Sequence, residues 1–213
     1  FSGYVSEHSG YHHGEMSLNM AIIGLAQNFV GSNNINLLMP NGSFGTRIHG
    51  GRDAASERYI FTQLSPITKY VYPEADNRIL NYKDDDGQSV EPEYYVPIIP
   101  MICVNGGKGI GTGFSSDIPQ CNVYNIIDYI LYRISDKVKK CPDIELHYEG
   151  FNGTIERLTD TKYLIKGCYE IIGVDTIRIT ELPIGTWTEK YKTYIEQLMD
   201  KKSDKKTQRC IVK

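Results

Sequence analysis

The region from residue 45 to residue 64 combines residue types that could do chemistry on a phosphodiester. It contains Arg47, Arg52 and Arg58, with His49 among them, in a glycine-containing loop that runs into Tyr59. A tyrosine phenol has a pKa of about 10 and is a poor nucleophile in water, but nearby guanidinium groups favour a phenolate and neutralise a phosphodiester. The pattern predicts an anion-binding loop that delivers a phenol. Because the chain has 16 tyrosines, a half-buried structural tyrosine is the alternative.

Two adjacent histidines, His12 and His13, stand just before a segment with helical apolar spacing. The spacing predicts a helix over residues 15–30 that Gly31 ends. Unpaired amide donors and the positive end of the helix dipole favour a phosphate at its start. Adjacent histidines are more often solvated or capping residues, so the sequence pattern alone does not assign them a function.

A glycine-rich run at residues 105–114 holds a second unusual feature. Its spacing matches neither a dinucleotide-binding nor a P-loop motif, and a tight exposed turn is the simplest interpretation. Ile110 is a bulky apolar residue isolated among these glycines, which suits a wedge that enters a base step. Lys108 adds a positive charge beside it.

The other expected elements combine helices with short strands, which predicts the α+β class. The helices are residues 2–8, 123–135 and 186–199, the last with Thr186 as N-cap; in the second of them Ile126, Ile127, Ile130, Leu131 and Ile134 face inward. Residues 33–40 are expected as a strand, residues 96–101 as a rigid extended segment, and three alternating stretches between residues 153 and 183 as one small antiparallel sheet. The acidic run 83–88 is interpreted as a tight turn rather than a metal site.

The composition leaves DNA binding open and argues against a zinc protein, a disulfide-rich protein and a membrane-spanning protein. A net charge of -3 does not by itself indicate a nucleic-acid partner, but residues 69–95 are acidic while the loop at residues 47–58 is basic, so a DNA surface can coexist with an acidic far side. The five cysteines form no Cys-x-x-Cys pair, which indicates neither a zinc site nor a disulfide framework. No apolar run is long enough for a membrane span. The absence of an initial methionine leads us to expect a piece of a longer protein.

Six ordered blocks carry a resemblance to a known family. They are YHHGE (11–15), LAQNFVGSNN (25–34), FGTRIHGG (44–51), RYIFT (58–62), EPEYYVPIIPM (91–101) and NGGKGIGTGF (105–114). Together they resemble the DNA breakage-reunion core of eukaryotic-type (type IIA) DNA topoisomerase II, from the first residue to about residue 192. Glu57 departs from the pattern, since many relatives have proline there.

The resemblance implies both a fold and site residues. It implies a winged-helix (CAP-like) domain over residues 1–130, followed by a partial tower (shoulder) domain over residues 131–213 with a basic tail. Tyr59 would form a 5′-phosphotyrosyl link to DNA, with Arg58 and His13 stabilising charge on the transferring phosphate, and Ile110 would intercalate and bend the duplex. We expect DNA contacts also from a second group of residues, which comprises Arg47, Arg52, His12 and Lys108.

The resemblance also implies partners and cofactors of a larger enzyme. That enzyme would be an intracellular homodimer that cuts double-stranded DNA, passes a second duplex with ATP and reseals the first, in the nucleus or, for a viral protein, in the host-cell cytoplasm. Mg²⁺ would be held by a Toprim region outside this chain, so we expect no metal site here and no cleavage by the chain alone. The alternatives are a non-catalytic winged-helix DNA-binding module and a metal nuclease that uses His12 and His13.

Overall fold

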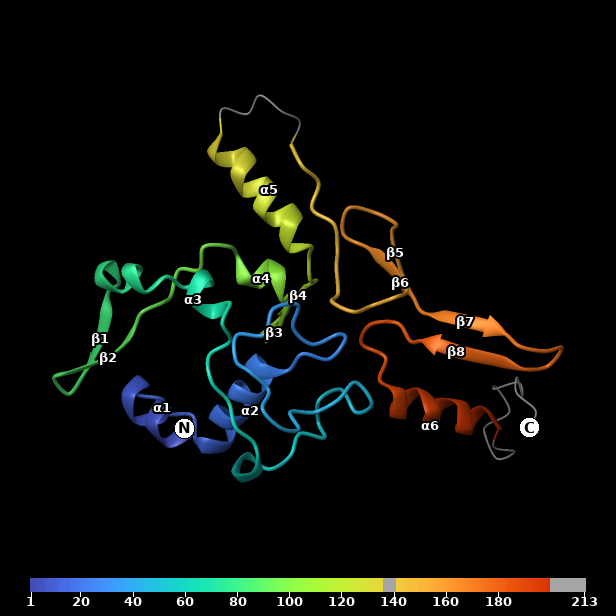
Figure 1. Cartoon of the computed structure of the whole chain (residues 1–213), viewed down its shortest axis with the longest axis horizontal. Coiled ribbons are helices and arrows are strands. Elements are labelled where there is room, and N and C mark those ends of the chain that lie inside the picture. Colours follow the sequence, from blue (N-terminus) through green and yellow to red (C-terminus); the bar gives the residue numbers. More distant parts are fainter. Residues whose placement is uncertain (136–140, 200–213) are drawn as a thin grey trace.

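The described chain combines helices with four separate two-stranded hairpins, which confirms the α+β class (Figure 1). The computed structural model describes residues 1–135 and 141–199. Its helices and 3-10 turns are α1 (Ser2–Ser9), α2 (Glu15–Ala26), η1 (Glu57–Tyr59), α3 (Thr68–Val71), η2 (Glu74–Ile79), α4 (Met101–Val104), α5 (Val123–Ile134) and α6 (Thr188–Met199). Its strands are β1 (Tyr82–Asp85), β2 (Gln88–Pro92), β3 (Gly107–Gly111), β4 (Phe114–Ile118), β5 (Thr154–Arg157), β6 (Tyr163–Lys166), β7 (Cys168–Ile171) and β8 (Ile177–Glu181).

Helix α2 supplies one side of the first apolar cluster. Ala26 is fully buried beside Leu38 and Phe44, and Ile60, which directly follows η1, packs against this group. The cluster therefore anchors both ends of the arginine-rich loop, because Phe44 precedes that loop and Ile60 follows it.

Helix α2 ends at Ala26, so the prediction that it continues to residue 30 is wrong. The Gln27 backbone is extended, and its side-chain Nε2 donates to the carbonyl oxygens of Phe44 (2.9 Å) and Gly51 (3.2 Å). The Asn33 side chain donates to the carbonyls of Gly24 (2.7 Å) and Gln27 (2.8 Å). Side-chain amides thus replace the hydrogen bonds that another helical turn would have made.

A second apolar cluster lies where α4 meets α5. It contains Ile99, Val104 and Ile126, all buried. Helix α5 starts where predicted, with the Asn122 side chain accepting hydrogen bonds from the backbone N–H groups of the next turn.

Only the first part of α5 is packed, so the prediction of an inward face along the whole helix is wrong. Leu131 and Ile134 are exposed, and the C-terminal half of α5 projects from the rest of the described chain (Figure 1). The apolar spacing indicates the helix but does not reveal how far its neighbours extend along it.

The predicted strand over residues 33–40 is absent from the described part of the chain. Within it only an isolated bridge forms, between Leu38 and Leu64, and a second bridge, between Asn41 and Phe61, lies just after it. The Asn36 side chain donates to the carbonyl of Leu38 at 2.8 Å, and such local bonds compete with a strand ladder.

The acidic run forms the turn that the sequence predicts. It joins β1 to β2, and Asp86 and Gly87 have positive φ angles of 50° and 85°. The carboxylate of Asp84 accepts a hydrogen bond from the Gly87 N–H at 2.9 Å.

The second half contains two hairpins rather than one sheet. Strand β5 pairs with β6 and β7 pairs with β8, with no ladder joining the two pairs among the described residues. Helix α6 begins at Thr188, because Thr186 belongs to a preceding turn in which its N–H donates to the carbonyl of Pro183 at 3.0 Å. The expected domain boundary after residue 130 falls inside α5 and remains a prediction, and the basic tail lies outside the described residues.

Candidate nucleic-acid interface

A 3-10 turn presents Arg58 and Tyr59 on the surface. In a strand these neighbours would point to opposite faces, but η1 bends the backbone at this place, with the Tyr59 N–H donating to the Ser56 carbonyl at 2.9 Å. The guanidinium carbon of Arg58 lies 5.1 Å from the centre of the Tyr59 ring, within the range of a cation–π contact. Tyr59 is 69% exposed, so its hydroxyl is available to a ligand.

The loop before η1 is closed by a carboxylate. Asp53 accepts hydrogen bonds from the backbone N–H (2.8 Å) and the hydroxyl (2.6 Å) of Thr46. The hydroxyl bond first, then the N–H bond and the charge of His49, hold the pKa of Asp53 below its usual value. At neutral pH an ionised Asp53 therefore fixes the base of a loop whose Arg52 side chain is exposed.

Arg47 points into the protein instead of joining the exposed basic group. One of its guanidinium nitrogens pairs with Glu181, and another donates to the carbonyl of Leu182 at 2.6 Å. The shared loop predicts that Arg47 contacts phosphate together with Arg52. The spacing of residues gives no sign of Glu181, a partner so far along the chain. Arg52 and Arg58 remain the exposed arginines of this loop.

The two histidines before α2 have different neighbours. His12 Nε2 lies 3.9 Å from a carboxylate oxygen of Asp85 in the acidic hairpin, while the His13 ring meets the edge of Tyr11 with centroids 5.4 Å apart. Both imidazoles are exposed beside the start of α2. No hydrogen bond or ion pair within the described ranges joins His13 to Tyr59, so any shared action on a phosphate requires the ligand between them.

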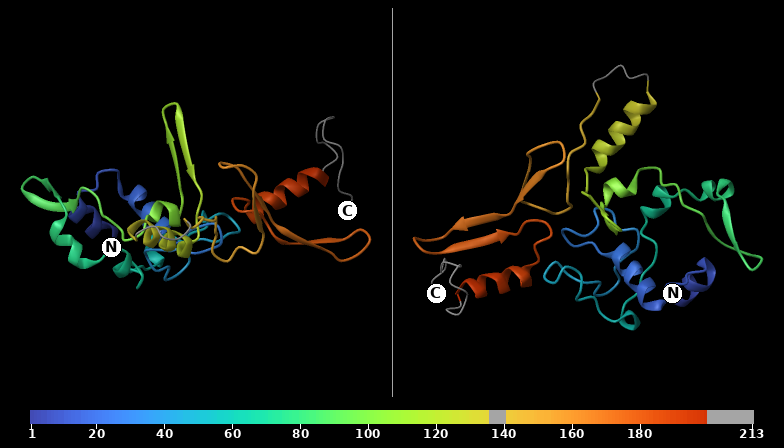
Figure 2. Two further views of the ribbon diagram at one scale, coloured as in Figure 1. Left: turned by 90° about the horizontal axis from the view of Figure 1, so that it is seen from above. Right: turned by 180° about the vertical axis from the view of Figure 1, so that it is seen from behind.

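The glycine-rich run forms a β-hairpin rather than a simple loop, and the hairpin stands out from the body (Figure 2). Ile110 pairs with Ser115 near its tip and is 97% exposed. Lys108 lies on the same face, with its ammonium 3.3 Å from Asp117 across the hairpin. Phe114 is exposed at the tip on the opposite face; the glycine spacing gives no sign of this, because strand alternation cannot be seen in a run of glycines.

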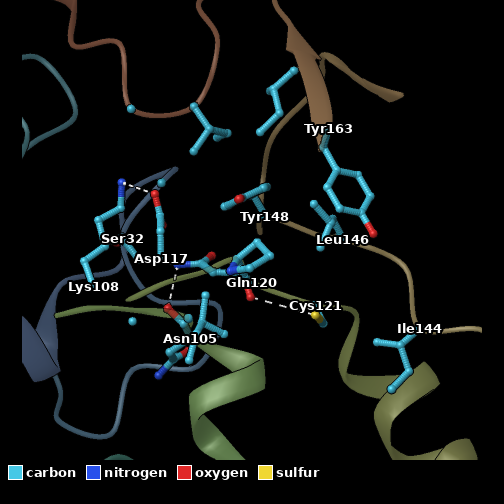
Figure 3. Close-up of a pocket in the computed structure, with 18 of the residues that line it drawn as sticks. Ser32, Asn105, Lys108, Asp117, Gln120, Cys121, Ile144, Leu146, Tyr148 and Tyr163 are labelled. Atoms are coloured by element: carbon cyan, nitrogen blue, oxygen red, sulfur yellow. Dashed lines mark hydrogen bonds and ion pairs between the residues drawn. The ribbon is translucent and has the colours of Figure 1, made fainter. Parts of the chain in front are cut away.

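A cavity of about 960 Å³ opens beside the base of this hairpin (Figure 3). Lys108 and Asp117 line it from the hairpin, and Tyr148 and Tyr163 line it from the second half. Burial raises the pKa of Tyr148, which favours its neutral phenol. The hairpin therefore rises beside a hollow that both halves of the chain form.

Neither a metal centre nor a membrane-spanning helix is found in the described part of the chain. Within residues 1–135 and 141–199, no cluster of three or more His, Cys, Asp or Glu side chains could hold a metal ion. None of the helices there has the length and apolarity needed to span a bilayer.

The described chain thus carries an exposed arginine–tyrosine turn, an arginine-rich loop and a projecting hairpin with an exposed apolar residue near its tip, on an α+β fold. The chain belongs to the DNA gyrase/topoisomerase IV A-subunit family, whose profile matches residues 1–210. It is 52% identical over 198 residues to DNA topoisomerase 2-alpha of Cricetulus griseus, and 52% identical over 201 residues to DNA topoisomerase 2 of Pisum sativum. These matches confirm the resemblance that the six blocks indicate.

A solved structure supports the same relationship. The structure of the Plasmodium falciparum topoisomerase II DNA-binding, cleavage and re-ligation domain matches with a TM-score of 0.89 and 49% identity, over 93% of this chain and 27% of that one. The sequence matches cover 93% and 94% of this chain, but only 13% of the Cricetulus griseus protein and 14% of the Pisum sativum protein. The chain therefore spans a small part of the length of its relatives.

Proposed function

We propose that this chain is the tyrosine-bearing part of the DNA cleavage and re-ligation core of a type II DNA topoisomerase. The observation that carries the proposal is the η1 turn, where an exposed phenol lies beside an exposed guanidinium at the end of a basic loop. The match to a DNA-binding, cleavage and re-ligation domain supports it. In this proposal residues 1–130 are a winged-helix domain and residues 131–213 begin a tower domain.

The reaction is a transesterification at a backbone phosphate. The hydroxyl oxygen of Tyr59 forms a bond to phosphorus and loses its proton, while the bond from phosphorus to the 3′ oxygen breaks and that oxygen gains a proton. The DNA is left with a 5′-phosphotyrosyl link and a free 3′-hydroxyl, and the reverse reaction reseals it. Arg58 and His13 stabilise the charge that develops on the phosphate oxygens.

The DNA duplex lies against the exposed basic side chains and the hairpin. Arg52 and Lys108 contact phosphates, which sets register without reading sequence, and His12 adds a contact beside α2. Ile110 enters a base step and bends the duplex. Arg47 is left out of this phosphate-binding group because its guanidinium is already paired with Glu181.

The family reaction uses Mg²⁺, but the described residues do not fit a site for it. In the acidic turn, Asp84 accepts a hydrogen bond from Gly87, Asp85 faces His12, and no cluster of three candidate ligands forms in the parts of the chain that the structure covers. We propose that a Toprim region outside this chain holds the ion. The same proposal includes cleavage by the complete dimer and strand passage driven by ATP. It also includes a nuclear location, although one relative, from Dictyostelium discoideum, is named as mitochondrial.

The experiment is adduct formation by the complete protein on a nicked duplex with Mg²⁺, comparing Tyr59→Phe with Tyr70→Phe, which alters another exposed tyrosine. We expect Tyr59→Phe to abolish the covalent protein–DNA product and Tyr70→Phe to retain it. An adduct that persists in Tyr59→Phe refutes the assignment of the nucleophile. Binding without any adduct in the unaltered protein favours a non-catalytic DNA-binding module.

A further inference from the structure

The side chain of Arg47 crosses from the arginine-rich loop to the end of β8. It pairs with the carboxylate of Glu181 and donates to the carbonyl of Leu182. The Arg47 side chain is 23% exposed and that of Glu181 is 7% exposed, so this pair is more buried than the other ion pairs among the described residues.

The other side of Glu181 is also occupied. Its Oε2 atom accepts from both the backbone N–H and the side-chain amide of Asn152, each at 3.4 Å. A buried carboxylate that has lost its cation is strongly unfavourable, and so is a buried cation that has lost its carboxylate. The charge of Arg47 is therefore neutralised by Glu181, and two of its guanidinium nitrogens are already engaged.

A second contact attaches the same loop to the same part of the chain. Trp187 lies directly over Gly50, whose φ is +65°, and a Cβ atom at Gly50 would come within 2.4 Å of the indole. The N–H of Glu189 donates to the carbonyl of Ile48 at 3.1 Å. The loop is thus held on both sides of Ile48, by Arg47 before it and by Gly50 after it.

We propose that Arg47 is a positioning residue, which with Glu181 fixes the arginine-rich loop so that Arg52, Arg58 and Tyr59 meet the scissile phosphate. The inference rests on the proposed cleavage function and deepens it. The Asp53 bonds to Thr46 close the loop at its base, so fixing Arg47 fixes the segment that leads to Tyr59. Loss of such positioning lowers the rate because a displacement of about 1 Å can cost about 10²-fold.

The test compares Arg47→Gln, Glu181→Gln and the double variant in the complete protein, with Arg52→Gln as the matched control. Two quantities are measured: the maximal cleavage rate at saturating DNA, and the slope of log binding constant against log salt. We expect both single variants to lower the maximal rate by about 10- to 100-fold with the slope unchanged. Because the double variant leaves no unpaired buried charge, its rate should be no lower than that of either single variant. Arg52→Gln should instead reduce the slope by about 0.9.

The opposite pattern identifies Arg47 as a phosphate contact. In that case Arg47→Gln would reduce the salt slope at a normal maximal rate, and Glu181→Gln would tighten binding by freeing a cation. Either of these results, or normal behaviour of both single variants, overturns the positioning role. Arg47→Lys is the control for misfolding, because it keeps the buried charge but not both contacts. Its maximal cleavage rate should lie between that of Arg47→Gln and that of the unaltered protein.

A readout in the 213-residue chain separates this inference from the cleavage function. Trp187 is the only tryptophan of the chain, so its fluorescence reports on the contact with Gly50. Arg47→Gln and Glu181→Gln should each shift the emission towards that of a more exposed indole, whether or not Tyr59 cleaves DNA. An unchanged emission in both variants counts against the coupling, whereas an adduct that survives Tyr59→Phe overturns only the cleavage function.

Discussion

Replacing Ile110 with alanine tests whether the β3–β4 hairpin acts as a wedge in DNA. Ile110 is 97% exposed and belongs to neither apolar cluster, so its truncation should leave the fold intact, with a change in unfolding free energy within about 0.5 kcal/mol. Any large effect on DNA must then come from contacts that the side chain makes in the complex.

The size of that effect follows from the apolar surface that insertion would bury. Ile110→Ala removes three carbon atoms from the side chain, and each buried CH₂ group contributes about 0.8 kcal/mol. The bent complex should lose about 2.4 kcal/mol relative to the unbent one, which lowers the ratio of bent to unbent complex by a factor of about 50. Cleavage should fall in parallel if it requires the bend.

The assay is fluorescence transfer between dyes at the two ends of a duplex bound by the complete protein. Val174→Ala is the control, because Val174 is likewise a fully exposed apolar residue near the end of a hairpin, in this case β7–β8. An end-to-end distance that is unchanged by Ile110→Ala refutes the wedge. An equal change in Val174→Ala shows that the loss of any exposed apolar side chain is enough, and likewise removes the specific role of Ile110.

Other expected outcomes concern the loop and the isolated chain. Arg58→Lys keeps a charge but loses the planar fork, and should lower the cleavage rate by about 10²-fold in single-turnover assays. Gly50→Ala should lower the free energy of unfolding by about 1–3 kcal/mol in denaturant titrations, because φ is positive there and Trp187 occupies the space of a Cβ atom. The Asp53 pKa is lowered, so the contribution of its Thr46 bonds to stability is present above its ordinary value of 3.8 and is lost as the pH falls through the lower folded value. The protection of the loop amides relative to their intrinsic exchange rates should show this loss from about pH 6 to about pH 2, and Asp53→Asn should remove it. The 213-residue chain should bind DNA weakly and with strong salt dependence but form no adduct with Mg²⁺, whereas a chain extended upstream through the Toprim region should form one.

Exposed side chains of unusual type are easier to predict from the sequence than the long-range contacts that hold their loops in place. Tyr59 and Ile110 stand out in the sequence because their residue types are unusual in a basic loop and in a glycine run, and the structure leaves both exposed. Arg47 was misplaced because its partner, Glu181, is distant in the sequence and no spacing rule connects the two. Phe114 was missed because the glycine run hides the strand alternation that brings it to the hairpin tip.

The limits of the predicted elements have a similar origin. Apolar spacing located α2 and α5, but the end of α2 depends on the side chain of Gln27, which bonds to residues beyond the helix. Ile134 fits the apolar period of α5 and is nevertheless exposed, because a period describes one helix and not its neighbours. Propensity thus indicates an element, whereas long-range contacts decide its length and burial.

The geometry between the tyrosine turn and the hairpin depends on side-chain amides. Ile60 anchors the turn to the first apolar cluster, while the hairpin follows α4 and the second cluster. Asn34 lies in the segment that joins Ala26 to Leu38, both in the first cluster, and its Nδ2 donates to the carbonyl of Val104 (3.0 Å) in the second cluster. Its Nδ2 also donates to the carbonyl of His147 (2.9 Å), and its Oδ1 accepts from the N–H of Glu149 (2.8 Å). A backbone carbonyl left without its donor in a partly buried place is costly, so this amide restrains how the two clusters sit. If the tyrosine must reach a phosphate while the hairpin enters a base step of the same duplex, the spacing that Asn34 helps to fix is part of the catalytic geometry.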